Sequence, residues 1–108
     1  MQQCDVFFRP ESIFVCCSLQ TVDGIWIGSD PVVKLPPNAS PEVLGKATIE
    51  ILGASRGGVP RPASPALPTK QFLKKVGFRS WKEFSRSAVN LIVSFDGTKV
   101  EIMPMEEL

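Results

Sequence analysis

Apolar residues gather in short stretches along the first third of the chain. Residues 4–8 and 13–19 are rich in aromatic and β-branched side chains, and the Arg-Pro-Glu-Ser segment between them, residues 9–12, has the composition of a turn. A second turn signal at residues 22–24 precedes the apolar triplet at residues 25–27. The pattern therefore predicts three consecutive strands joined as a β-meander.

Prolines limit the strand pattern after this triplet. The Gly-Ser-Asp-Pro segment at residues 28–31 is expected to end the third strand. Residues 32–35 are again apolar, but Pro31, Pro36 and Pro37 remove backbone donors on both sides of them. We expect residues 32–35 to add at most a short extension to one edge of the sheet.

The spacing of apolar residues changes to three and four after residue 40, which predicts a helix. Ser40 is suited to cap its start, Pro41 to the first helical position, and Glu42 to the positive end of the helix dipole. The Ser-Arg-Gly-Gly segment at residues 55–58 is expected to end it. The predicted buried face consists of Leu44, Ala47, Thr48, Ile51 and Leu52.

Two short helices are predicted further along. Thr69 is expected to cap the first, which runs to Val76 and stops at Gly77, a residue that tolerates left-handed backbone. Its buried face holds Phe72, Leu73 and Val76. Residues 80–83, Ser-Trp-Lys-Glu, match a capping box at the start of the second helix. Trp81 and Phe84 of that helix are expected to face inward.

The end of the chain has the pattern of a hairpin. Residues 88–95 alternate and are β-branched, Asp96-Gly97 suits a two-residue turn, and residues 98–103 are expected to return antiparallel. Residues 105–108 form an acidic tail that is expected to fray. The sequence therefore predicts an α+β fold: an antiparallel sheet of N-terminal meander and C-terminal hairpin, packed by one longer and two short helices.

Length and composition narrow the class of protein. A chain of 108 residues, 44% hydrophobic and 21% charged, is expected to form a single domain over residues 1–108. The formal net charge of +1 gives no strong field for nucleic acid, so nucleic-acid partners are not expected. The N-terminus lacks a secretory pattern, and no apolar run approaches the roughly 20 residues that span a bilayer. We expect a cytoplasmic protein without a membrane partner.

The side chains offer little catalytic chemistry. There is no histidine, the residue best suited to proton transfer near neutral pH. Cys16 and Cys17 lie in a predicted apolar strand where burial raises thiol pKa, and with Cys4 they lack the paired spacing of a zinc site. We therefore expect no enzyme, no catalytic residue, no metal and no cofactor.

Two segments have both a functional and a plainer interpretation. Residues 57–68 hold four prolines, which fits a proline-rich ligand but also an extended connector from the longer helix back to the sheet. Residues 70–86 mix cations with aromatic residues, as nucleic-acid binders do. Helical spacing explains the mixture otherwise, because it places the aromatics on buried faces and the cations in solvent.

Three stretches taken together resemble a bacterial family, the immunity proteins of contact-dependent growth inhibition. They are Leu-Gly-Lys-Ala at residues 44–47 leading into Ser-Arg-Gly-Gly-Val-Pro at 55–60, the segment Val-Gly-Phe-Arg-Ser-Trp-Lys-Glu-Phe at 76–84, and the hairpin that ends with Ile-Met-Pro at 102–104. The resemblance covers residues 21–104. Its motifs are caps, turns and core aromatics, which indicate kinship rather than a particular partner.

The resemblance implies a cytoplasmic protein that binds and blocks the toxic C-terminal domain of a large exported effector, a domain that is often a nuclease. We expect the free chain to be a monomer or weak homodimer. It carries over no site residue. From residue type and expected exposure we select Asp23, Trp26, Asp30 and Arg56 as candidate interface residues. The alternatives are a nucleic-acid-binding adaptor, a structural subunit of a bacterial assembly, or a small enzyme with a cysteine nucleophile.

Overall fold

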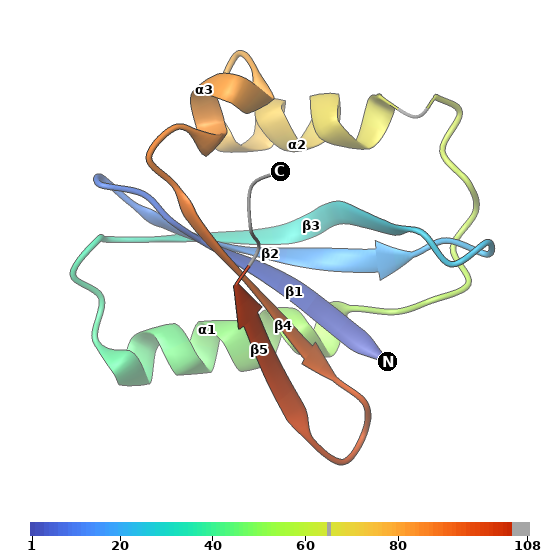
Figure 1. The fold of residues 1–108 in the computed structure, drawn as a ribbon, viewed down its shortest axis with the longest axis horizontal. Helices are drawn as coiled ribbons and strands as arrows, with labels where there is room; N and C mark the ends of the chain where they lie inside the picture. The colour runs from blue at the N-terminus through green and yellow to red at the C-terminus, as the bar shows by residue number, and fades with distance from the viewer. Residues whose placement is uncertain (65, 105–108) are drawn as a thin grey trace.

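Five strands form one antiparallel sheet in the computed structural model, which describes residues 1–64 and 66–104 (Figure 1). The order across the sheet is β3-β2-β1-β4-β5, so the N-terminal meander and the C-terminal hairpin meet at the central strand β1. This confirms the predicted α+β class and the strand arrangement; the predicted tail at residues 105–108 lies outside the described residues. The strands are β1 (Gln2–Phe8), β2 (Ile13–Gln20), β3 (Trp26–Leu35), β4 (Val89–Phe95) and β5 (Val100–Pro104).

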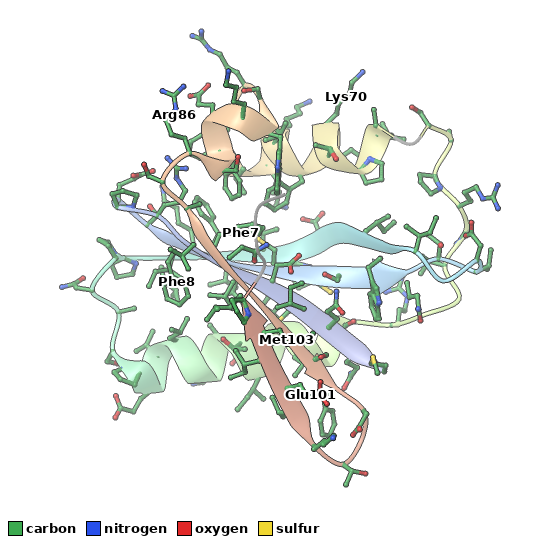
Figure 2. The ribbon with its side chains drawn as sticks, in the orientation of Figure 1. Phe7, Phe8, Lys70, Arg86, Glu101 and Met103 are labelled. Atoms are coloured by element: carbon green, nitrogen blue, oxygen red, sulfur yellow. The ribbon has the colours of Figure 1, made fainter. Side chains whose placement is uncertain are left out.

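Helices cover both faces of the sheet. The longer helix α1 (Pro41–Ala54) lies on one face, while α2 (Leu67–Val76) and α3 (Trp81–Ser85) lie on the other (Figure 1). Figure 2 shows the consequence of strand alternation, with Phe7 directed to the side of α2 and α3 and Phe8 to the side of α1. None of the helices in the described part of the chain has the length and apolar character needed to cross a membrane.

The face under α1 is aliphatic. Ser40 caps the helix as predicted, because its Oγ accepts a hydrogen bond from the Val43 amide at 3.3 Å. At the other end the buried Ser55 hydroxyl donates to the Ser18 carbonyl at 2.6 Å and accepts from the Gln3 amide at 2.9 Å, which ties α1 to β2 and β1. The packed residues include Cys4, Val6, Val15, Cys17, Leu19, Ala47, Ile51, Leu52 and Val93.

The face under α2 and α3 is aromatic. Phe84 is fully buried, and its ring lies 4.9 Å from that of Phe7 and 5.2 Å from that of Phe72 between centroids. Gly77 ends α2 in the predicted left-handed conformation, with φ of 84°. Ser80 caps α3 by accepting from the Glu83 amide at 3.1 Å. The predicted stop at Gly77 and the predicted cap at Ser80 are therefore both present where α2 leads into α3.

Arg9 fixes the end of α3 to the sheet. Its guanidinium donates to the carbonyl oxygens of Phe84 and, at 3.1 Å, Arg86, and it pairs with the Glu11 carboxylate at 2.8 Å. The same guanidinium lies over the Phe78 ring at 4.5 Å from the centroid. A residue predicted only as part of a turn thus anchors a helix through charge-assisted hydrogen bonds and a cation–π contact.

The third strand differs from the prediction. Residues 28–31 do not end it; β3 continues to Leu35, past the residues expected to form a separate edge extension. Cys17 pairs with Ser29 and Cys16 with Val32, so Asp30 and Pro31 have no partners in β2. A bulge absorbs these two residues at the sheet edge, where the missing proline donor breaks no ladder.

Three local predictions also need correction. Phe95 pairs with Val100, so the hairpin connection has four residues rather than the predicted two, and the Asp96 carboxylate holds it by accepting from two following amides. Helix α2 begins at Leu67 with Pro68 in its first turn, so Thr69 lies inside the helix and does not cap it as predicted. Trp81 packs against the aromatic core as predicted, with its ring 5.9 Å from that of Phe7, but it is not buried, because 45% of it is exposed.

The proline-rich segment serves as a connector. It leaves the end of α1, passes the end of β2 and reaches α2 on the opposite face (Figure 1). Val59 is buried along the way, donating to the Gln20 carbonyl at 3.1 Å and accepting from the Val22 amide at 3.0 Å. These bonds support the plainer of the two interpretations of residues 57–68.

Candidate functional site

Three neighbouring hollows run along β3 and α2. Asp23 and Arg61 line the first, which shares Ile25, Ile27 and Pro68 with the middle hollow. The middle hollow shares Gly28 and Phe72 with the third, which Asp30 and Lys75 line. We call this surface the β3–α2 groove, defined by residues 25–32 on one side and by Pro68, Phe72, Lys75 and Trp81 on the other.

The middle hollow has a volume of about 280 Å³ and reaches down to the sheet. Asp5 and Phe7 of β1 and Cys16 of β2 line it, because alternate residues of these strands point to the side of α2. Its other lining residues include Trp26 of β3, Phe72 of α2 and Trp81 of α3. Aromatic side chains from four elements therefore surround a single carboxylate.

Asp5 is the least expected member of this hollow. Burial raises the pKa of its carboxyl to about 6, and a hydrogen bond with the Ser18 side chain counteracts part of the rise. Oδ1 of the carboxylate is buried and has no hydrogen-bond partner among the described residues. Because an unpaired charge in apolar surroundings is costly, Asp5 lowers the stability of the fold at neutral pH.

The aromatic residues of the hollow belong to the core beneath it. The Trp81 ring meets that of Phe7 edge to face, with centroids 5.9 Å apart, and lies 6.2 Å from that of Phe72. Phe7 and Phe72 are buried, whereas Trp81 stays largely exposed and Trp26 half-buried. The core thus holds one side of the Trp81 ring in place and leaves the rest available for contact.

Three of the four candidate interface residues line the groove. Asp23 lies in the turn before β3, accepts from the Thr21 hydroxyl at 2.6 Å and pairs with Arg61 at 3.0 Å. The Thr21 hydrogen bond is the largest cause that lowers the pKa of its carboxyl. Trp26 lines the middle hollow. Asp30 projects from the bulge of β3 and pairs with Lys75 of α2 at 2.9 Å.

Arg56 lies apart from the other three candidates. It follows the end of α1, where its carbonyl accepts from the Gln20 amide at 2.9 Å, and its side chain is exposed. It lines none of the hollows of the groove. Of the four residues selected from the sequence, the structure therefore brings Asp23, Trp26 and Asp30 together in the groove and places Arg56 outside it.

The cysteine thiols are buried in the sheet. Burial raises the pKa of the Cys4 thiol to about 12 and also raises the pKa of Cys16 and Cys17. All three thiols are free, and Cys16 contributes to the base of the middle hollow. Such thiols are protonated at neutral pH and are poor nucleophiles.

Two residues of the hollow were missed by the sequence interpretation. Asp5 has a recognisable signal, since it is a charged residue inside the predicted strand 4–8 and shares a face with Phe7 two positions later. Trp81 was assigned to the core, and its hydrophobicity gives no sign of the exposed edge. The tertiary placement of α3 against β1 and α2 decides that Trp81 is a partly exposed wall of the hollow and not a buried core residue.

Comparison with known proteins adds a fold relationship. Neither a family model nor a curated protein matches the chain. Among solved structures, a "Protein of Unknown Function NMB0488 from Neisseria meningitidis" is similar, with a TM-score of 0.76, 14% identity, and coverage of 95% of this chain and 71% of that chain. At this identity the similarity establishes a shared fold and leaves function to be argued from the site.

Proposed function

We propose that this chain is an immunity protein that binds and neutralises the toxin domain of a contact-dependent growth inhibition effector in the cytoplasm of the cell that makes both. The resemblance of residues 44–47, 55–60, 76–84 and 102–104 to that family supports this choice of partner. In this proposal the chain acts by binding alone, without a cofactor. The buried, protonated thiols and the absence of histidine support a non-enzymatic role.

The observation that carries the proposal is the β3–α2 groove. Its Trp81 and Ile25 are 45% and 57% exposed, and charge pairs of Asp23 with Arg61 and Asp30 with Lys75 flank the apolar middle. Protein interfaces commonly have this anatomy, with aromatic anchors inside a polar rim. The groove also supplies local complementarity, which a chain of net charge +1 needs in place of long-range steering.

Co-expression tests the proposal. The toxin domain encoded immediately upstream should arrest growth when expressed alone, and this chain should restore it. Asp30→Lys should weaken rescue, because it replaces a rim carboxylate with a cation beside Lys75. Glu50→Lys is the matched control: it makes the same charge change at an exposed position on α1, away from the groove, and should rescue fully. Failure of the wild-type chain to rescue contradicts the proposal.

The outer surface of α2 and α3 favours a second candidate, a nucleic-acid-binding adaptor. Figure 2 shows Lys70 and Arg86 on the side of these helices that faces away from the sheet. Retention of the chain on immobilised DNA or RNA that falls steeply with salt would favour this candidate. No such retention, together with growth rescue, would favour the immunity role. The other exposed cations of residues 70–86 are Lys74, Lys75, Arg79 and Lys82, of which Lys75 lines the groove.

A further inference from the structure

The carboxylate in the middle hollow has no cation of its own. Among the described residues the ion pairs join Arg9 to Glu11, Arg61 to Asp23, Lys75 to Asp30 and Lys99 to Glu101, and none includes Asp5. Lys75, the cation of the neighbouring hollow, is paired with Asp30 at 2.9 Å. Asp5 is therefore half-buried at the base of an open hollow, and its buried Oδ1 is unsatisfied.

The walls of the hollow are suited to a cation. Trp26, Phe72 and Trp81 line it together with Phe7, and the faces of aromatic rings attract positive charge. A planar guanidinium can stack on such rings while its N–H groups bond a carboxylate, and it is more weakly hydrated than an ammonium group. Aromatic walls around a carboxylate thus match the end of an arginine side chain better than they match an apolar group.

The chain already contains one arginine whose guanidinium lies over an aromatic ring while it bonds a carboxylate. The Arg9 guanidinium lies 4.5 Å from the centroid of the Phe78 ring while it bonds the Glu11 carboxylate at 2.8 Å. Phe78 in turn packs on Phe84, the centre of the same aromatic core. The middle hollow presents the aromatic and carboxylate parts of such a site without the guanidinium.

We propose that the middle hollow of the β3–α2 groove binds an arginine side chain of the partner protein, with the guanidinium between the aromatic walls and the Asp5 carboxylate. The inference rests on the proposed function, since it supplies the anchor by which the toxin domain is recognised. Binding compensates the buried charge of Asp5, so the residue that weakens the free protein strengthens the complex.

The test needs no toxin. Trp26 and Trp81 are the two tryptophans of the chain and both line the hollow, so intrinsic fluorescence reports on it directly. N-acetyl-arginine amide should change the fluorescence in a saturable way. N-acetyl-citrulline amide, its neutral isostere, should bind at least about tenfold more weakly, which corresponds to the loss of a charge-assisted contact.

Variants distinguish binding of the ligand in the hollow from nonspecific electrostatic attraction to the protein surface. Asp5→Asn should reduce arginine amide binding by about tenfold or more, whereas Glu50→Gln, at an exposed position on α1 away from the groove, should leave it unchanged. Thermal unfolding of each variant verifies that it folds. Equal binding of the citrulline amide, equal binding by the Asp5 variant, or no saturable signal with the arginine amide overturns the inference. A failed titration with intact growth rescue rejects this anchor alone, and failed rescue with a positive titration rejects the toxin partner alone.

Discussion

The two faces of the sheet carry different chemistry although the same strands build both. Alternate residues of β1 send Cys4 and Val6 toward α1 and Asp5 and Phe7 toward α2 and α3. Under α1 the packing is aliphatic and continues into the helix without an unpaired charge. Under α2 and α3 the packing is aromatic, and a hollow of about 280 Å³ with a buried carboxylate interrupts it.

In the proposed function, this difference separates stability from recognition. The α1 face buries a contiguous aliphatic surface and closes its helix end through the Ser55 hydrogen bonds. On the other face, the β3–α2 groove contains a hollow and a carboxylate without a partner cation. Binding sites often lack optimal packing or charge pairing, because their function requires an accessible surface. The comparison predicts that changes on the α1 face affect folding alone, whereas some changes on the opposite face affect binding and folding in opposite directions.

The largest expected effect is at the centre of the aromatic core. Phe84→Ala removes a fully buried ring and should lower the free energy of unfolding by about 3–5 kcal/mol, measured by urea denaturation. It should also release Trp81, whose ring lies 5.5 Å from that of Phe84. A loss below about 1.5 kcal/mol would mean that the aromatic side is not an integral core.

Substitution of Asp5 should change the free energy of unfolding in the opposite direction and stabilise the protein. Its folded-state pKa of about 6 lies above the ordinary 3.8, so between these values the folded state binds the proton more tightly. The contribution of Asp5 to the free energy of unfolding is therefore most favourable below pH 4, falls as the pH rises, and is least favourable above pH 6. Asp5→Asn should remove this slope and raise the free energy of unfolding at pH 7 by about 2–3 kcal/mol.

Urea denaturation across pH 4 to 8 measures the difference between the two proteins. Asp30→Asn is the matched control, because its exposed carboxylate contributes little to folding. A parallel pH dependence of wild type and Asp5→Asn would contradict a buried, unpaired carboxylate. A stabilised variant that also loses arginine amide binding would show that one residue trades stability for recognition.

The smallest of the three effects is expected on the α1 face. Ser55→Ala removes one hydroxyl that bonds the Gln3 amide and the Ser18 carbonyl, so both backbone groups lose their partner. The free energy of unfolding should fall by about 1–2 kcal/mol in urea denaturation, with ligand binding unchanged. Thr98→Ala, at an exposed position of the β4–β5 connection, is the control and should change stability by less than about 0.5 kcal/mol.

The sequence predicted the elements that depend on local signals. Ser40, Gly77 and Ser80 mark helix ends through caps that need only neighbouring residues, and the structure has those caps. The course of β3 was not predictable in this way. Proline and glycine at residues 28–31 indicate a turn, and only pairing with β2 carries the strand past Asp30 and Pro31 as a bulge.

The candidate site was predictable in part for the same reason. Asp23 and Asp30 were selected as exposed acids near β3, and exposure follows from turn chemistry. The hollow itself joins β1, β2, α2 and α3, and no local pattern shows that Asp5 and Trp81 meet across it. Long-range packing decides this placement, as it also decides that Arg56 lies outside the groove.

The most direct test of the account is the affinity of the purified chain for the toxin domain encoded upstream, measured by calorimetric titration for wild type, Trp26→Ala and Ile49→Ala. Ile49 is an exposed apolar residue of α1, on the opposite face from the groove. The account predicts tight binding by the wild type and by Ile49→Ala, and a loss of at least about 2 kcal/mol for Trp26→Ala. Equal affinity of the two variants, or no binding by the wild type, would contradict the groove as the binding surface.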